Sequence, residues 1–71
     1  MTALEIRTII ATGGGVVVDA SQFSTLDLRT FASAAKTSHT FVHIKNASCK
    51  STLDCRTIAN AGSGHVLFDF T

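Results

Sequence analysis

The sequence predicts a small α/β protein in which three tandem helix–strand units form a parallel sheet with helices on one face. The first observation is an internal repeat, since residues 19–35 and 46–62 are identical at ten of seventeen aligned positions. An earlier copy opens the chain near residue 2, and all three share the pattern Ser/Thr-x-Leu-acid-apolar-Arg-Thr-apolar. Repetition at this period indicates an array of one structural unit. We therefore divide a single domain of 71 residues into units of about 2–20, 24–47 and 51–71.

The second observation is an amphipathic helical pattern in every copy. A hydroxyl residue stands three positions before an acid, which is the spacing of a capping box at a helix start. The pairs are Thr2 with Glu5, Ser24 with Asp27, and Ser51 with Asp54. Apolar or small residues then recur at i, i+3, i+4 and i+7: Ile6, Ile9, Ile10 and Gly13; Leu28, Phe31, Ala32 and Ala35; Cys55, Ile58, Ala59 and Gly62. We expect helices near residues 3–12, 25–35 and 52–61, with Gly13–Gly15 and Gly62–Gly64 ending two of them.

The third observation is a short β-branched or aromatic stretch after each helix, which predicts strands near residues 15–20, 40–46 and 65–70. Strands joined through helices pair in parallel with right-handed crossovers. One face of the sheet would meet the helices through Val16, Val18, Val42, Ile44, Val66, Phe68 and Phe70. The opposite face would carry Val17, Asp19, Phe41, His43, Lys45, Leu67 and Asp69. Parallel sheets are normally covered on both faces, so this second face needs a cover.

A β-solenoid is the alternative fold. Leu26, Leu28 and Thr30 alternate with Asp27, Arg29 and Phe31, as the residues of a strand would. The repeated Leu4, Leu26 and Leu53 also lie almost opposite the helical stripe, so a helix leaves them without a role. The capping boxes and the alanine-rich segment 32–35 favour the helix.

The alternation of helix and strand at about 25 residues resembles a leucine-rich-repeat array. The segment from Phe41 to Asn46, with its closing asparagine, is similar to the strand and asparagine turn of that family. Valine and phenylalanine stand where the family has leucines. The resemblance implies a binding scaffold, and it assigns no functional residue.

Composition limits the classes of function. The net charge of +1 provides no long-range field for nucleic acid or an anionic membrane. Cys49 and Cys55 are too few for a secreted disulfide scaffold, so we expect reduced thiols and a cytoplasmic protein. Arg7 interrupts the first apolar stretch, which argues against a signal peptide. The apolar runs are too short to span a bilayer.

No group of residues forms a recognisable catalytic or metal-binding pattern. His39, His43 and His65, with the two cysteines, fit no known ligand spacing, so we expect neither metal nor cofactor. The Gly13–Gly15 run lacks the Lys-Ser/Thr of a phosphate loop. We therefore do not expect an enzyme.

Two hypotheses for function remain. The first is a non-catalytic protein-interaction or assembly module that binds itself, as a dimer or larger closed oligomer, or another protein. Its interface candidates are Val17, Phe41, Leu67, Phe68 and Phe70. The alternative is an accessory protein that binds anions or nucleic acid through the repeated Arg7, Arg29 and Arg56, although the charge argues against nucleic acid. Without such a ligand, we expect these arginines to pair with the acidic residues Glu5, Asp27 and Asp54 of neighbouring units.

Overall fold

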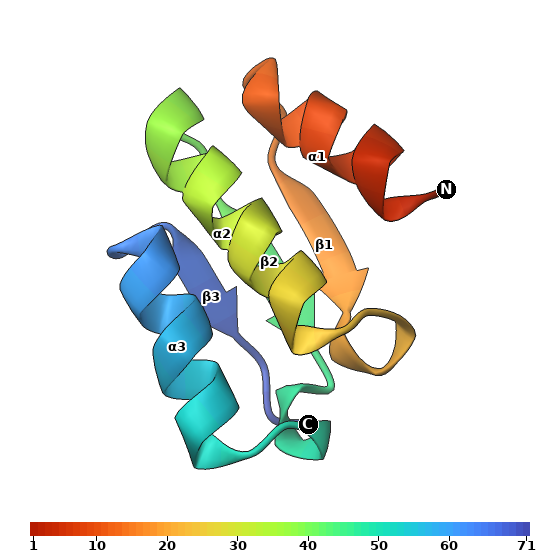
Figure 1. Ribbon diagram of the computed structural model, residues 1–71, viewed down its shortest axis with the longest axis vertical. Helices are drawn as coiled ribbons and strands as arrows, with labels where there is room; N and C mark the ends of the chain where they lie inside the picture. Colours follow the sequence, from red (N-terminus) through yellow and green to blue (C-terminus); the bar gives the residue numbers. More distant parts are fainter.

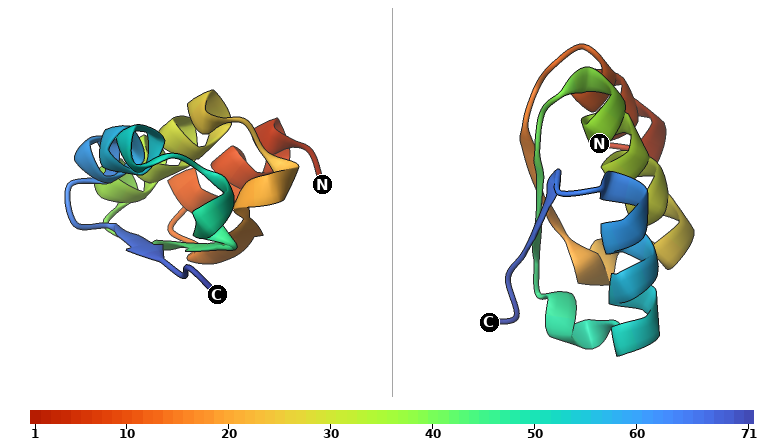
Figure 2. Two further views of the ribbon diagram at one scale, coloured as in Figure 1. Left: turned by 90° about the horizontal axis from the view of Figure 1, so that it is seen from below. Right: turned by 90° about the vertical axis from the view of Figure 1, so that its left-hand side faces the viewer.

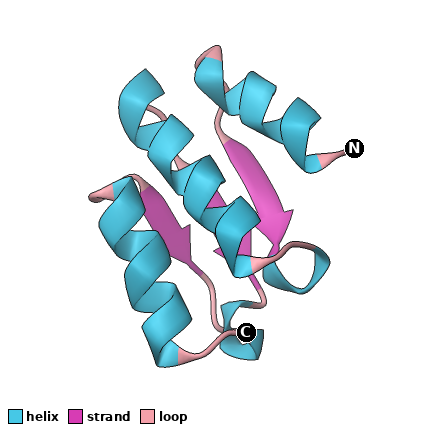
Figure 3. Cartoon of the chain, in the orientation of Figure 1, coloured by secondary structure: helices cyan, strands magenta, loops and turns pink.

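The computed structural model describes residues 1–71 and shows three helices alternating with three strands. The order is α1 (Ala3–Ala11), β1 (Val16–Asp19), α2 (Thr25–Ser38), β2 (Val42–Lys45), α3 (Thr52–Gly62) and β3 (Val66–Phe68). Short 3₁₀ turns, η1 (Ala20–Gln22) and η2 (Ala47–Cys49), follow the first two strands. The α/β prediction is confirmed, and the β-solenoid alternative is wrong because the Leu-acid-apolar-Arg segments are helical (Figure 3).

The strands form one parallel sheet in the order β1-β2-β3. Val16 pairs with Val42, and Val42 pairs with Val66, so the three valines form a row across the sheet. All three helices lie side by side over one face (Figure 1). Figure 2 shows the two layers edge-on, with nothing covering the other face of the sheet.

Each helix begins at the predicted hydroxyl residue, whose side chain accepts a hydrogen bond from the backbone N–H three positions on. The N···O distances are 3.2 Å for Thr2, 3.1 Å for Ser24 and 3.1 Å for Ser51. The return bond forms only in the first unit, where Thr2 N–H donates to Glu5 Oε1 at 2.8 Å. This hydrogen bond is the largest cause of the lowered pKa of Glu5. The aspartates of the other two units have a shorter side chain, and their capping boxes are incomplete.

The repeated threonine of each unit is satisfied inside its own helix. Its hydroxyl donates to the carbonyl of the repeated leucine four residues earlier, at 2.9 to 3.0 Å in all three copies: Thr8 to Leu4, Thr30 to Leu26 and Thr57 to Leu53. A threonine hydroxyl can compete with the helix for backbone hydrogen bonds, and here it is satisfied within the helix. Local structure therefore accounts for the identity of this threonine in the three units.

α1 ends as expected, just before Gly13, which has a positive φ of 104°, whereas the ends of α2 and α3 differ from the expected ones. α2 continues to Ser38 and is capped by His39, which is left-handed at φ 58°. α3 includes Gly62, and Ser63 takes the left-handed position at φ 49°. Gly62 stays in the helix because it is buried, and a Cβ there would lie 2.2 Å from Val66 Cγ2. The glycine is therefore required for packing against β3, and it is not the stop signal.

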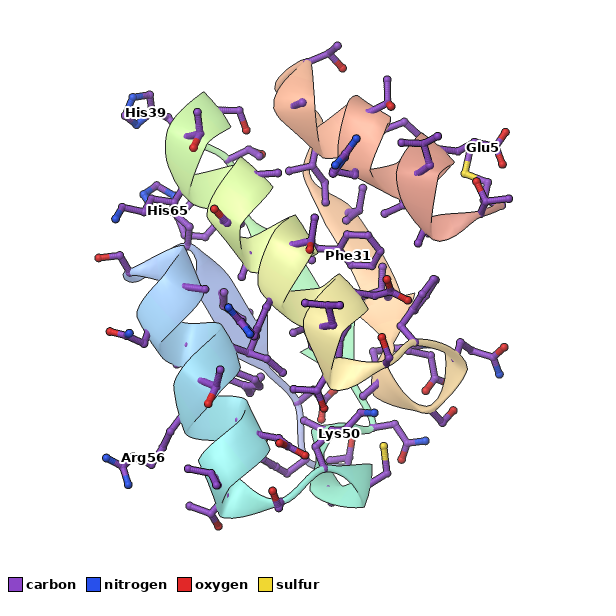
Figure 4. The ribbon with its side chains drawn as sticks, viewed as in Figure 1. Glu5, Phe31, His39, Lys50, Arg56 and His65 are labelled. Atoms are coloured by element: carbon purple, nitrogen blue, oxygen red, sulfur yellow. The ribbon has the colours of Figure 1, made fainter.

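The hydrophobic core lies between the helices and the sheet, with Phe31 at its centre (Figure 4). The whole predicted stripe of α2 is buried, because this helix has a neighbour on either side. α1 and α3 lie at the margins, and there the stripe is only partly covered: Ile9 is 36% exposed and Ala59 is exposed. The Phe23 ring meets Phe31 edge-on at 5.2 Å between centroids and closes one end of the core.

The expected position of Phe70 against the helices is wrong. β3 ends at Phe68, and Phe70 is 60% exposed, with its ring stacked on Phe68 at 6.0 Å between centroids. The carboxylate of Asp69 accepts hydrogen bonds from the backbone N–H and the hydroxyl of Thr71. This local turn matches the one in which Asp19 binds Ser21, and it takes the chain out of the strand.

Candidate interaction surfaces

The uncovered face of the sheet carries the first three interface candidates. Val17, Phe41 and Leu67 are 58–61% exposed. Val17 and Leu67 both pair with His43, so the side chains of Val17, His43 and Leu67 form a row across the sheet. Phe41 lies two residues before His43, on the same face. A shallow hollow of about 360 Å³ lies over this region, lined by Gly15, Val16, Val17, Phe41, His43, Gly64, Val66 and Leu67. The hollow is mainly apolar, as a protein-binding surface requires.

Phe41 lines this hollow together with two glycines. Gly15 and Gly64 line it and carry no side chain, which leaves space around the ring. The Phe41 ring also lies beside the His65 ring, with 5.4 Å between the two centroids. His65 is itself held by its Nδ1, 2.7 Å from the Thr40 carbonyl oxygen. Phe41 is thus an exposed aromatic side chain beside a histidine ring that a hydrogen bond holds in place.

The carboxyl ends of the strands make the same face charged. Asp69 Oδ2 lies 3.9 Å from His43 Nε2, and Asp19 pairs in register with Lys45. Hydrogen bonds from Thr71 lower the pKa of Asp69, with smaller contributions from His43 and Lys45. Hydrogen bonds from Ser21 do the same for the pKa of Asp19. The face is therefore apolar at one end and ionic at the other.

The outer edge of β3 is the second feature of this side. Val42 N–H donates to the His65 carbonyl, and Asp69 N–H donates to the Ile44 carbonyl. Because parallel pairing uses alternate residues, the backbone groups of Val66 and Phe68 point away from β2. Open strand edges of this kind are templates for pairing with another strand.

The outer surface of the helices carries the three repeated leucines, which lie outside the apolar stripe. Leu4, Leu26 and Leu53 are 62–68% exposed, and each stands three positions before an arginine of the repeat. Residues three apart are neighbours on a helix surface, so every unit presents a leucine beside an arginine. We call these the Leu–Arg pairs: Leu4 with Arg7, Leu26 with Arg29, and Leu53 with Arg56.

The structure divides the three arginines into two groups. Arg7 and Arg29 line one groove of about 570 Å³ along α2, together with Ala11, Leu26, Thr30, Ser33, Ala34, Thr37, Ser38 and Ala61. Arg56 lies apart, in a separate hollow beside Leu53, and points away from α2 (Figure 4). The only Lys, Arg or His side chain within 4.0 Å of a carboxylate is His43, beside Asp69. The expected pairing of arginines with neighbouring acidic residues therefore does not form.

The remaining polar candidates do not come together as a centre. The rings of His39 and His65 are 6.2 Å apart, at one end of the molecule (Figure 4). No set of three or more His, Cys, Asp and Glu residues is placed to hold a metal ion. Both cysteines are free thiols. Burial, with the nearby Asp54 and Cys49, raises the pKa of the Cys55 thiol, which makes this cysteine a poor nucleophile.

No family model, curated protein or solved structure matches this chain. None of its helices combines the length and the hydropathy needed to cross a bilayer.

Proposed function

We propose that this protein is a non-catalytic assembly module that binds copies of itself, through the open edge of β3 and through the uncovered face of the sheet. The observation that carries the proposal is the exposure of Val17, Phe41 and Leu67 on a parallel sheet that has helices on one side only. Burial of these three side chains would contribute about 25 cal/mol for each Å² of apolar surface removed from water.

A second copy is favoured because two bare surfaces adjoin at β3. The free backbone groups of Val66 and Phe68 can pair with the same groups of another β3, running antiparallel about a two-fold axis. Such an interface is self-complementary, as in most dimers. The stacked rings of Phe68 and Phe70 lie next to this edge and would pack across the axis. The result is a six-stranded sheet, a common size for globular proteins.

The size of the sheet argues for an assembly that uses both surfaces, each to bind a different copy. Three strands about 4.8 Å apart and four residues long cover roughly 14 by 13 Å. This footprint is well below the roughly 800 Å² per partner of a standard interface. The sheet face of one copy is therefore too small for a stable dimer. Antiparallel pairing at the β3 edge, with contact from Phe68 and Phe70, places two uncovered faces on the same side of the joined sheet, where a second pair of copies can cover them. The resemblance to a leucine-rich-repeat array agrees with a binding scaffold.

Sedimentation at micromolar concentration tests this function. We expect the native chain to be a dimer or larger, and Phe70→Asp to shift it toward monomer. Leu26→Asp is the matched control, because Leu26 has similar exposure on the opposite side of the molecule. Circular dichroism establishes that both variants keep their helices. A native chain that is monomeric, or an assembly that Phe70→Asp leaves intact, contradicts the proposal.

A further inference from the structure

Among the three units the helix positions that face the core vary, whereas one exposed leucine and one exposed arginine are identical. The stripe that faces the core changes from Ile6 to Leu28 to the partly buried Cys55 along the repeat. The exposed leucine and arginine of the Leu–Arg pairs are identical in all three units. The threonine is explained by its backbone bond and the acid by its place in the first turn of the helix. Neither explanation covers the leucine or the arginine, so their retention points to a role at the surface.

We propose that the groove between Arg7 and Arg29 binds an extended acidic segment of a partner protein, in which acidic and apolar residues recur together. The groove has an apolar part, made by Leu26 with Ala11, Ala34 and Ala61. It has a cationic part, made by two guanidinium groups that have no carboxylate within 4.0 Å. This surface is separate from the sheet face and the β3 edge, and the proposal does not depend on self-association.

The hydrogen-bond donors of the groove define the charge of the ligand. Thr30, Thr37 and Ser38 donate their hydroxyl hydrogens to carbonyls of α2 at 2.9 to 3.1 Å. The Ser33 hydroxyl and the guanidinium groups are therefore the free donors, and only the guanidinium groups carry charge. They match carboxylate or phosphate oxygens, which can accept two parallel N–H bonds from one arginine.

Three observations favour a protein segment over nucleic acid. No aromatic side chain lines the groove, so there is no platform on which a base can stack. The exposed Leu26 has no role in contacting a phosphate backbone, whereas it can pack against an apolar side chain of a peptide. The net charge of +1 also provides little non-specific attraction for a polyanion.

The spacing of the helices indicates the conformation of the segment. Packed helices lie about 8–10 Å apart, so the arginines of α1 and α2 stand roughly one helix separation from each other. An extended polyproline II segment has three residues per turn and rises about 3.1 Å per residue. Its every third side chain therefore lies on the same face, about 9 Å from the last. A segment with an acid at each third position and a leucine beside it matches both Arg7 and Arg29.

Fluorescence anisotropy with a labelled peptide of repeated Glu-Leu-Ser triplets tests the site. We expect binding that weakens about fivefold in Arg7→Ala and in Arg29→Ala, and about threefold in Leu26→Ala. Lys36→Ala removes a charge from α2 outside the groove, and Arg56→Ala removes one from the other hollow. These two controls should change the affinity by less than about twofold.

Matched probes separate the contributions of charge and apolar contact. Peptides of Lys-Leu-Ser and of Glu-Ser-Ser triplets should both bind more weakly than Glu-Leu-Ser, the first because its charge is wrong and the second because it lacks leucine. Absence of binding by Glu-Leu-Ser would overturn the proposal. So would an equal loss in Lys36→Ala, which indicates net charge alone. Tighter binding of an oligothymidylate than of the peptide would assign the groove to nucleic acid instead.

Discussion

The side-chain amide of Asn46 lies 3.5 Å from the carboxylate of Asp19, its counterpart 27 residues earlier in the preceding unit. A second contact at the same offset joins Lys50 Nζ to the Phe23 carbonyl oxygen at 3.0 Å. Equivalent residues of consecutive units therefore face each other at the carboxyl ends of the strands. These contacts link the turns that follow β1 and β2, and they make the stability of the array sensitive to the charge of Asp19.

We predict that acid destabilises the protein through Asp19 and Asp69. Both carboxyls have a pKa below the ordinary value of 3.8, because Ser21 and Thr71 donate hydrogen bonds to them. The folded state then binds fewer protons than the unfolded state, so this stabilisation is complete above about pH 5 and is lost as the pH falls through the lowered pKa. Urea unfolding at a series of pH values should show a smaller acid-induced loss in Asp19→Asn and in Asp69→Asn.

Asp27→Asn is the control for this prediction, because the Asp27 carboxylate accepts no hydrogen bond although its backbone N–H is capped by Ser24. It should keep the pH dependence of the native chain. Equal acid sensitivity in all three variants would show that the two turns do not carry the effect.

Leu28 and Leu26 should differ sharply although they stand two residues apart on α2. Leu28 is fully buried, so Leu28→Ala should lower the free energy of unfolding by about 2–4 kcal/mol through lost contacts and the cavity left behind. Ile58→Ala on α3 should cost a similar amount, since Ile58 is equally buried. Leu26 is exposed, so Leu26→Ala should change stability by less than about 0.5 kcal/mol. Chemical denaturation measures all three, and a costly Leu26→Ala would place that leucine in the core.

Gly62→Ala should destabilise the protein by about 1–3 kcal/mol through overpacking. The added methyl would lie 2.2 Å from Val66 Cγ2 and 3.2 Å from Ala32 Cβ, so α3 must move away from both β3 and α2. Gly15→Ala is the matched control, because its nearest contacts, at 3.4 Å, are of ordinary length. A neutral Gly62→Ala in denaturant titration would mean that α3 lies farther from the sheet.

Ser63→Gly should stabilise the protein by about 0.5–1 kcal/mol, since glycine adopts the left-handed conformation without steric cost. The same reasoning applies to His39→Gly at the end of α2, which also has a positive φ. The midpoint of thermal unfolding should rise in each variant. A fall in both would show that the side chains of Ser63 and His39 support the helix ends in some other way.

The exposed leucines show where reasoning from the sequence reached its limit. The apolar stripe of the helices excludes Leu4, Leu26 and Leu53 from the core. Burial of these repeated apolar residues would instead require the β-solenoid. The structure decides between the two, because all three leucines are exposed on the outer surface of the helices. Their exact repetition beside an arginine was the available signal of a surface role.

Interactions within a few residues determined the type and order of the elements, and these could be predicted from the sequence alone. Hydroxyl caps, the threonine back-bonds and the apolar period each depend on neighbours at most four positions away, so the repeat specifies them three times. Burial and side-chain grouping depend on distant segments, and only the tertiary structure decided them. The middle helix buries its whole stripe because it has two neighbours, whereas α1 and α3 have one each. Likewise, Arg7 and Arg29 line a groove shared by α1 and α2 while Arg56 lies in a separate hollow on α3, a difference that the repeated sequence does not show.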